Sequence, residues 1–373
     1  MHVFVVSILG QTLIHLLIAL FIWNSTKKGS LTRRLFIGVV AFLYLLFIAI
    51  WSIRSLLSLD QISALIRLFN NYYIFLVLLM VYSFLPIAII TVLEWFKLIK
   101  RRRAKAMRSV AFIIFVPITL VLCIWGHSNT INPKTQHYEI ELPHHGAERD
   151  LKIALITDIH IGEIIRQKNI EHLVRMVQAE QPDYVFLGGD IIDYYFNQVE
   201  AQPEITNALK ELHPDPNRLI IALGNHEYYV DTEVKKGWLR SIGTLMVDSV
   251  AHLQDSLYLI VRDDANNEGR LPLKALCAKI PEGGTTIVLE HQPGSTQESA
   301  DNHIHLALHG HTHAGQFVPF NWAVAAEFPI HYGYAQKEDT QFVVSSGYGV
   351  AGSTFRVGTH SEIVMLHLKL RQP

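Results

Sequence analysis

The sequence His309-Gly310-His311-Thr312-His313-Ala314-Gly315-Gln316 places three imidazoles within five residues, next to two glycines. The apolar residues 304–308 come directly before it and predict a strand that ends where the histidines begin. Neutral imidazole is the commonest transition-metal ligand, and Gly310 allows the backbone to approach a metal without a Cβ clash. This stretch predicts a metal-binding loop at a strand end. Taken alone, the stretch also fits a His-rich surface loop, and the segments upstream distinguish the two interpretations.

Four upstream segments repeat the same arrangement, in which a short apolar strand is followed by polar side chains. Strands are predicted over residues 151–157, 184–187, 218–223 and 285–290. Helices predicted over 167–180 and 202–212 connect the first three of them, which is typical of a parallel sheet. The polar residues that follow the strands are Asp158 and His160, Asp190 and Asp193, Asn225 and His226, and His291. Because α/β sheets carry their chemistry beyond the carboxyl ends of the strands, we expect these side chains to converge.

The residue types at these strand ends indicate a two-metal hydrolase. Carboxylate, amide and imidazole ligands together suit two divalent ions of the Mn, Zn, Fe or Mg type rather than calcium alone. Asp190 can bridge two cations. Two cations about 3.5–4 Å apart polarise a phosphoryl group and lower the pKa of a bridging water, so that hydroxide is available near neutrality. Each segment alone is also explained by a polar turn or a helix N-cap, and only their combination favours the metal site.

The first 125 residues carry four apolar runs that approach or reach the roughly 20 residues needed to cross a bilayer. The runs are 2–23, 35–51, 73–95 and 110–125, and each ends at a tryptophan, a residue enriched at membrane interfaces. We therefore predict a four-helix transmembrane anchor over 1–125, a linker over 126–150 and a soluble α/β domain over 151–373.

Basic residues in the connecting loops predict the orientation of this anchor. The first loop holds Lys27, Lys28, Arg33 and Arg34, the second only Arg54 and Arg67, and the third Lys97, Lys100, Arg101, Arg102, Arg103, Lys105 and Arg108. The positive-inside rule assigns the first and third loops to the cytoplasm. With four spans, both termini and the soluble domain would then lie outside the cytoplasm.

Composition excludes several other functions. A net charge of −1 gives no whole-chain basic excess, so nucleic acid is not an expected partner. The two cysteines, Cys123 and Cys277, are too few for a disulfide framework or a thiolate metal site. Apart from His2 at its start, the apolar runs contain His15 and Glu94 as their ionisable residues, which argues against a transport pathway. The bilayer itself is the expected partner of the first half.

Together the five blocks resemble the signature of calcineurin-like metallophosphoesterases, in both order and spacing. The blocks are Asp158-x-His160, Gly189-Asp190-x-x-Asp193, Gly224-Asn225-His226-Glu227, His291 and Gly310-His311-x-His313. The resemblance covers about residues 150–370. The stretch 310–316 and the late Gly-rich turn with Arg356 are most similar to the membrane-attached bacterial branch. The resemblance implies an α/β fold, a two-sheet β-sandwich flanked by helices, in a protein of the bacterial inner (plasma) membrane.

The resemblance also implies a role for each site residue. One metal ion would be held by Asp158, His160, Asp190 and His313, and the other by Asp190, Asn225, His291 and His311. His226 would protonate the leaving oxygen or bind phosphate, and Asp193 would orient His226. Arg356 would contact phosphate, unless it is an ordinary surface arginine. His309 falls outside the ligand set. Tyr194 stands where the Ser/Thr phosphatase branch has a phosphate-binding arginine, which argues against phosphoprotein phosphatase activity.

These observations lead to the hypothesis of a membrane-anchored dinuclear phosphoesterase that hydrolyses a phosphorylated lipid or another cell-envelope phosphoester. A nucleotide-sugar lipid pyrophosphatase and a non-catalytic membrane sensor or scaffold are the alternatives. We expect substrate selectivity to reside in residues 228–285 and 317–335. The aromatic residues beside the metal blocks either pack structurally or receive an acyl chain or a base; they are Tyr194, Tyr195, Phe196, Tyr228 and Tyr229.

Overall fold

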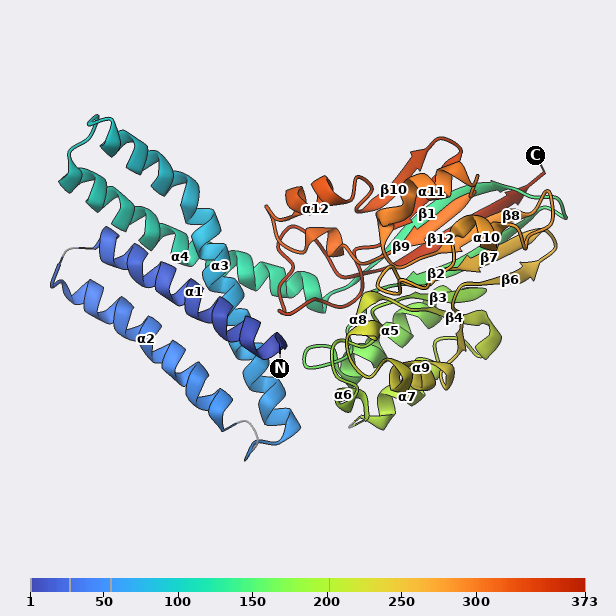
Figure 1. The fold of residues 1–373 in the computed structure, drawn as a ribbon, viewed down its shortest axis with the longest axis horizontal. Coiled ribbons are helices and arrows are strands. Elements are labelled where there is room, and N and C mark those ends of the chain that lie inside the picture. Colours follow the sequence, from blue (N-terminus) through green and yellow to red (C-terminus); the bar gives the residue numbers. More distant parts are fainter. Residues whose placement is uncertain (1, 27, 54–55, 201, 373) are drawn as a thin grey trace. The chain divides into compact units, whose positions relative to one another are not determined.

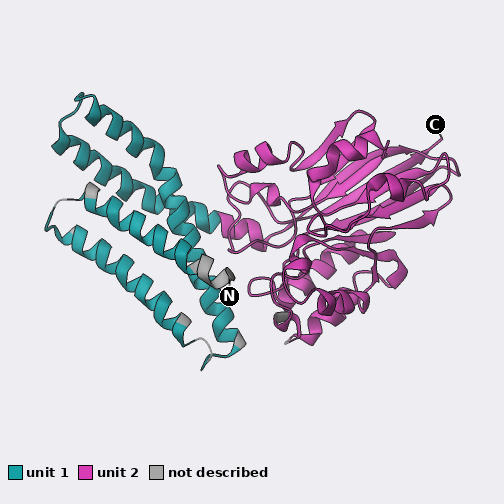
Figure 2. Cartoon of the chain, viewed as in Figure 1, with its two compact units in different colours: residues 1–125 teal, residues 126–373 magenta. Residues whose placement is uncertain are grey.

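The computed structural model describes residues 2–26, 28–53, 56–200 and 202–372. The chain divides into two compact units, Met1–Trp125 and Gly126–Pro373 (Figure 2). Lys27 and Arg54, two of the basic residues used above to predict orientation, lie outside the described residues.

The first unit is helical (Figure 1). Its helices are α1 (His2–Ser25), α2 (Leu31–Ser52), α3 (Leu59–Trp95) and α4 (Arg101–Ile131), the last of which ends in the second unit. Helix α3 begins well before the predicted span at 73, because Ser58 and Gln61 form a capping box at its start. Apolar side chains such as Ile18, Leu79 and Phe112 pack between the helices.

Three of these helices are long and apolar enough to cross a membrane, over Arg33–Ile50, Asp60–Trp95 and Arg101–Ile131. The described apolar part of α1, Ile8–Trp23, is shorter. Many leucine and phenylalanine side chains on these helices face outward, as a lipid environment requires. An apolar helical region at the N-terminus is therefore confirmed, with three or four helices that can serve as spans.

Two six-stranded sheets form the second unit. The order in the first sheet is β1 (Lys134–Pro143), β12 (Glu362–Arg371), β2 (Arg149–Ile156), β3 (Tyr184–Gly188), β4 (Leu219–Ala222) and β5 (Thr244–Leu245). The order in the second sheet is β10 (Gly333–Lys337), β11 (Thr340–Val344), β9 (Leu306–His309), β8 (Thr285–Leu289), β7 (Leu257–Val261) and β6 (Ser249–Gln254). Strands β2, β3 and β4 are parallel to one another, as are β7, β8 and β9.

The main core lies between the two sheets. Leu155 and Phe186 of the first sheet belong to the same buried cluster as Leu289 and Leu308 of the second. Side chains on the other face of the first sheet pack against α5 (Gln167–Glu180), α7 (Pro203–Lys210) and α9 (Thr232–Arg240), and those of the second sheet against α10 (Leu273–Cys277). The remaining helices are α6 (Asn197–Glu200), α8 (Asn225–Tyr229), α11 (Thr296–Asp301) and α12 (Asn321–Glu327). The predicted α/β fold, a two-sheet sandwich flanked by helices, is confirmed.

The predicted linker over 126–150 is wrong for most of its length. Residues 134–143 form β1, which pairs in parallel with β12 from Lys134 opposite Glu362 to Pro143 opposite Arg371. Ile140 and Leu142 are buried between the sheets. The alternation of apolar and acidic residues from Tyr138 to Leu142 is a strand pattern, and it explains why this segment joins the sheet.

Candidate metal centre

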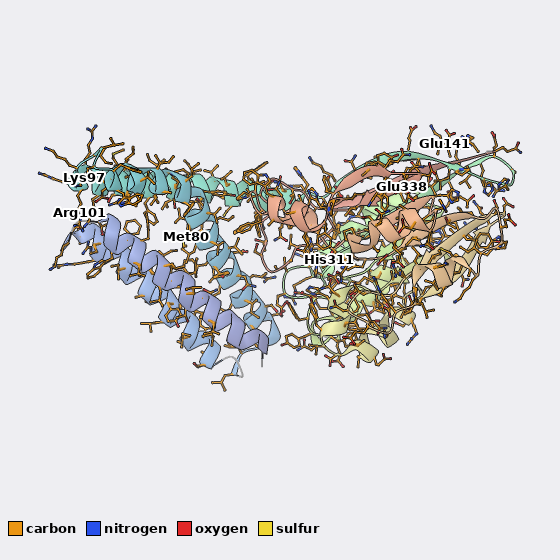
Figure 3. The ribbon with its side chains drawn as sticks, turned by 45° about the horizontal axis from the view of Figure 1, so that its top comes forward. Met80, Lys97, Arg101, Glu141, His311 and Glu338 are labelled. Atoms are coloured by element: carbon orange, nitrogen blue, oxygen red, sulfur yellow. The ribbon has the colours of Figure 1, made fainter. Side chains whose placement is uncertain are left out.

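The candidate metal ligands converge at the carboxyl ends of five strands. Asp158 and His160 follow β2, Asp190 follows β3, Asn225 opens α8 after β4, His291 follows β8, and His311 and His313 follow β9. Three groups each bring their ligand atoms within 4.8 Å of one another: Asp158, His160 and His313; His160, Asp193 and His226; Asp190, His291 and His311. His311 is labelled in Figure 3. The residues that the sequence singled out are therefore brought together.

The first group is arranged like ligands of one cation. The Nε2 atoms of His160 and His313 are 3.1 Å apart. Asp158 Oδ1 lies 3.6 Å from His313 Nε2 and 4.0 Å from His160 Nε2. Atoms that each bind a shared ion at about 2.0–2.2 Å are separated by distances of this order.

Asp190 connects the first group to a second one. Its Oδ2 lies 3.2 Å from His291 Nε2 and 3.8 Å from His160 Nε2. Its Oδ1 accepts a hydrogen bond from the backbone N–H of His226 at 2.8 Å. One carboxylate oxygen of Asp190 therefore faces both groups of imidazoles while the other is held by the backbone, which is the arrangement that a bridging ligand needs.

The tautomer of His291 is set by its other ring nitrogen. Nδ1 lies 2.8 Å from the carbonyl oxygen of Gly188, to which it donates a hydrogen bond. In the neutral ring Nε2 then carries the lone pair; this atom is buried and has no hydrogen-bond partner among the described residues. A metal-ligating histidine is oriented in this way.

Asn225 shows the same signature through its amide. Its Nδ2 donates to the Tyr229 hydroxyl at 2.6 Å. Its Oδ1 is buried and has no hydrogen-bond partner in the part of the chain that the structure describes. Because buried polar atoms are almost always paired, an unpartnered amide oxygen fits a metal ligand, and the next residue, His226, binds Asp190 through its backbone N–H. Tyr229, which sequence reasoning noted only as an aromatic residue, orients this amide from one helical turn away.

Asp193 lies between two imidazoles. Its Oδ1 is 3.0 Å from His226 Nδ1 and 3.6 Å from His160 Nδ1. Burial raises the pKa of the Asp193 carboxyl, but the nearby His160 and His226 outweigh this effect and lower the pKa to about 2. Asp193 is therefore ionised at neutral pH and can orient His226 and stabilise its protonated form. Its contact with His160 was not predicted from the sequence.

The electrostatics differ from one imidazole of the site to the next. Burial lowers the pKa of His291 and His160, but nearby carboxylates, chiefly Asp190 for His291 and Asp193 for His160, outweigh it and raise both pKa values, so that a cation would displace a proton there. Burial, together with the neighbouring His291, lowers the pKa of His311 to about 4. Burial raises the pKa of Asp190, but His291, His160 and His226 outweigh it and hold the pKa well below its usual range. At neutral pH, His311 is neutral and Asp190 is ionised, and these are the protonation states of metal ligands.

The backbone at the site is held in an uncommon conformation. The φ angle is positive at five candidate ligands: Asp158 (52°), His160 (52°), Asp190 (51°), His311 (72°) and His313 (48°). Residues other than glycine rarely adopt this left-handed conformation, and strain of this kind concentrates at functional sites. Glycines permit the close approach, since a Cβ on Gly224 would lie 2.2 Å from Asp190 Oδ1, and one on Gly310 would lie 2.5 Å from Asp158 Oδ2.

Comparison with known proteins identifies the domain. Residues 151–315 match the family model of the calcineurin-like phosphoesterases. The chain carries a calcineurin-like metallophosphoesterase domain. An uncharacterized metallophosphoesterase of Helicobacter pylori is 33% identical over 228 residues, covering 59% of this chain and 60% of that protein. The match thus spans less than two thirds of this relative's length.

Two further relatives extend the similarity beyond the phosphoesterase domain. An uncharacterized metallophosphoesterase of Campylobacter jejuni is 28% identical over 295 residues, covering 72% of this chain and 73% of that protein. A bovine transmembrane protein with metallophosphoesterase domain is 32% identical over 282 residues, covering 68% of this chain and 61% of that protein. The predicted family is confirmed for this domain, and these relatives are named as metallophosphoesterases or as carrying a metallophosphoesterase domain.

Two buried charges near the phosphoesterase site were missed by sequence reasoning. Glu227 is fully buried, and its carboxylate accepts hydrogen bonds from the backbone N–H groups of Asp190, Ile191, Ile192 and Gly224. Lys235 is fully buried and donates to the carbonyl oxygens of Asp193 (3.1 Å) and His226 (2.7 Å). Glu227 directly follows His226 in a recognised block, so its position was a usable signal. Lys235, on an amphipathic helix, gave none.

The predicted phosphate contact of Arg356 is contradicted by the structure. Arg356 is fully buried, and its Nη2 donates to the carbonyl oxygens of Ser346 (2.7 Å) and Gly349 (2.6 Å). The same nitrogen lies 3.0 Å from His313 Nδ1. Arg356 therefore fixes the loop behind His313. His309 is also fully buried, with Nδ1 2.8 Å from the carbonyl oxygen of Glu290, and lies outside the ligand groups as expected.

Proposed function

We propose that this chain is a membrane-anchored phosphoesterase that uses two divalent cations to hydrolyse a phosphoester of a lipid or another cell-envelope molecule. The observation that carries the proposal is the position of Asp190 Oδ2 between His291 Nε2 (3.2 Å) and His160 Nε2 (3.8 Å). A single oxygen that faces two clusters of imidazole ligands is suited to two adjacent cations.

The ligands divide between the two positions as their contacts suggest. Asp158, His160 and His313 would hold one cation together with Asp190. Asn225, His291 and His311 would hold the other together with Asp190. The two unpartnered buried atoms, Asn225 Oδ1 and His291 Nε2, support the second position. The identity of the ions within the Mn, Zn, Fe and Mg group is left to experiment.

The protein's own residues would then complete the hydrolysis. Bound cations polarise a phosphoester and make an activated water available near neutral pH. His226 lies at the edge of the site with Nδ1 against Asp193 and Nε2 3.9 Å from Asp190 Oδ2. With Nδ1 held by the Asp193 carboxylate, the protonated ring of His226 would donate its Nε2 proton to the leaving oxygen. Asp193 acts here as a positioning residue.

The orientation proposed for the membrane region rests on the basic loops and on α1 acting as a fourth span. The second loop is poor in Lys and Arg, whereas the first and third are rich in them. The phosphoesterase domain would then lie outside the cytoplasm, in a bacterial inner membrane. Labelling of single cysteines in the loops of intact cells with a membrane-impermeant reagent tests this arrangement. Labelling of the third loop in intact cells would indicate the opposite orientation.

Metal removal and reconstitution test the proposed activity. The full chain in detergent is stripped of metal and supplied with Mn²⁺, Zn²⁺, Fe²⁺ or Mg²⁺, and hydrolysis of an aryl phosphomonoester and an aryl phosphodiester is followed. We expect turnover that depends on metal and is lost in Asp190→Ala and strongly reduced in His226→Ala. Full metal occupancy without turnover on either ester, or on phospholipid vesicles, would contradict the proposal and favour a non-catalytic scaffold.

A further inference from the structure

The segment that follows the metal ligand His313 exposes apolar side chains on the surface of the phosphoesterase domain. Residues 314–326 contain no charged side chain. Helix α12 begins within this segment and ends one residue beyond it, at the exposed Glu327; none of its seven residues, all of them described, is buried. Trp322 is 72% exposed and Phe320 is 38% exposed. A helix that faces water normally presents polar residues, so this surface is matched to an apolar environment.

Both ends of this segment are attached to the loop that carries the metal ligands. Residues 317–330 are named here the apolar lobe. At one end it continues directly from His313. At the other end the Thr312 hydroxyl donates to the His331 carbonyl oxygen at 2.6 Å, and the Phe328 ring meets the His311 ring edge-on at 5.7 Å. Whatever the apolar lobe contacts is therefore brought close to the metal centre.

Backbone hydrogen bonds also connect the base of the apolar lobe to the end of α4. Val318 N–H donates to the Val357 carbonyl oxygen at 2.9 Å, and the adjacent Arg356 N–H donates to the Gly126 carbonyl oxygen at 3.0 Å. Gly126 directly follows Trp125, the last residue of an apolar run of spanning composition. In Figure 1, α12 and the last turns of α4 lie at the same end of the second unit. The apolar lobe is thus held near the residue where the chain leaves this run.

We propose that the apolar lobe inserts into the interfacial layer of the bilayer that the apolar helices cross, with Trp322 and Phe320 as its anchors. Tryptophan and other aromatic side chains favour this layer, and residues 314–326 carry no charge that would oppose insertion; the exposed Glu327 at the end of α12 would remain on the aqueous side. The metal centre then faces phosphoesters at the membrane surface. This inference rests on the proposed function and narrows its substrate to an amphiphile embedded in the bilayer.

Site-specific fluorescence tests insertion independently of activity. In the full chain with Cys123→Ser and Cys277→Ser, Trp322→Cys is labelled with an environment-sensitive fluorophore and reconstituted into phosphatidylcholine–phosphatidylglycerol vesicles. The matched control is Val234→Cys, on α9 and 53% exposed. We expect the label at 322 to be quenched by lipids with a nitroxide in the headgroup region and protected from aqueous iodide. The label at 234 should show the opposite pattern.

A second measurement concerns the substrate. The variant Phe320→Ser with Trp322→Ser should lower the ratio of vesicle-phospholipid turnover to soluble aryl-ester turnover by at least about tenfold, since burial of even one large aromatic side chain is worth about that factor. Equal iodide quenching at 322 and 234 would overturn the inference. Protection of 322 from iodide without quenching by the nitroxide lipids would overturn it as well, because that result indicates a second copy of the chain rather than lipid as the covering partner. Absence of any wild-type turnover would contradict the proposed function instead, since the quenching result does not depend on turnover.

Discussion

Replacing Tyr229 with phenylalanine removes a single oxygen from the metal centre while keeping the ring. That oxygen accepts the Asn225 amide N–H at 2.6 Å, whereas the ring packs against His226 at 4.7 Å and Tyr194 at 5.6 Å between centroids. In Tyr229→Phe the packing is retained. The amide of Asn225 loses the one described hydrogen bond that fixes its orientation.

The expected magnitude follows from that one contact. A neutral hydrogen bond contributes about 1 kcal/mol, and a buried N–H left unpaired adds a penalty of similar size. Loss of a residue that orients a metal ligand weakens metal affinity by roughly 10–100-fold. We therefore expect about tenfold weaker binding of one ion. The other ion should be unaffected, because Tyr229 makes no described contact with Asp158, His160 or His313.

Metal titration of the stripped full chain against a competing chelator, with the bound ions counted by mass spectrometry, measures this effect. Tyr195→Phe is the matched control, because both tyrosines are 46% exposed and Tyr195 has no described bond to a candidate ligand. Two ions bound by Tyr229→Phe with wild-type affinity would refute the reasoning. An equal loss in Tyr195→Phe would refute it as well.

Three further outcomes are expected. Glu227→Gln removes the anionic acceptor of four backbone N–H groups, so the free energy of unfolding should fall by about 3 kcal/mol in denaturant titration, and a change within error would contradict that role. Because the pKa of Asp193 is lowered to about 2, its stabilising effect should be complete above about pH 4 and lost between about pH 4 and 2. In metal-free Asp193→Asn, the melting temperature should fall less between about pH 4 and 2 than it does in the wild type. Equal falls in the two proteins would contradict this prediction. A chain shortened to residues 126–373 should melt cooperatively, whereas one shortened to 146–373 should aggregate because β1 is gone; equal solubility would count against a structural role for β1.

Local periodicity was sufficient to predict much of the fold. The helix predicted over 167–180 is confirmed as Gln167–Glu180, since Ile170, Leu173, Val174 and Val177 form one buried face. The strand predicted over 285–290 is confirmed as Thr285–Leu289. The strand ends could be placed because each apolar run stops at a polar residue.

Long-range features were not predictable from local pattern. Strand β1 was overlooked because its partner β12 lies more than 200 residues away, and its alternating pattern was taken for a linker. The resemblance suggested a phosphate contact for Arg356, with an ordinary surface arginine as the alternative, yet Arg356 is buried and donates to the carbonyl oxygens of Ser346 and Gly349. Local sequence does not reveal which backbone oxygens will surround a buried cation.

The buried charges explain how the metal ligands are kept in a strained backbone. A left-handed residue other than glycine is disfavoured by about 1–2 kcal/mol, and five candidate ligands share this conformation. Glu227 accepts hydrogen bonds from N–H groups that follow Gly189. Lys235 donates to carbonyl oxygens of Asp193 and His226. Arg356 donates to carbonyl oxygens of Ser346 and Gly349, next to His313.

Each of these charges is unfavourable to bury unless its hydrogen bonds are formed, and the strained turns present the backbone groups that form them. The ligands recognised from the sequence and the charges missed in it are therefore parts of one arrangement. Removing one of these charged side chains should therefore destabilise the turn that it binds, and altering that turn should leave the charge without its hydrogen bonds.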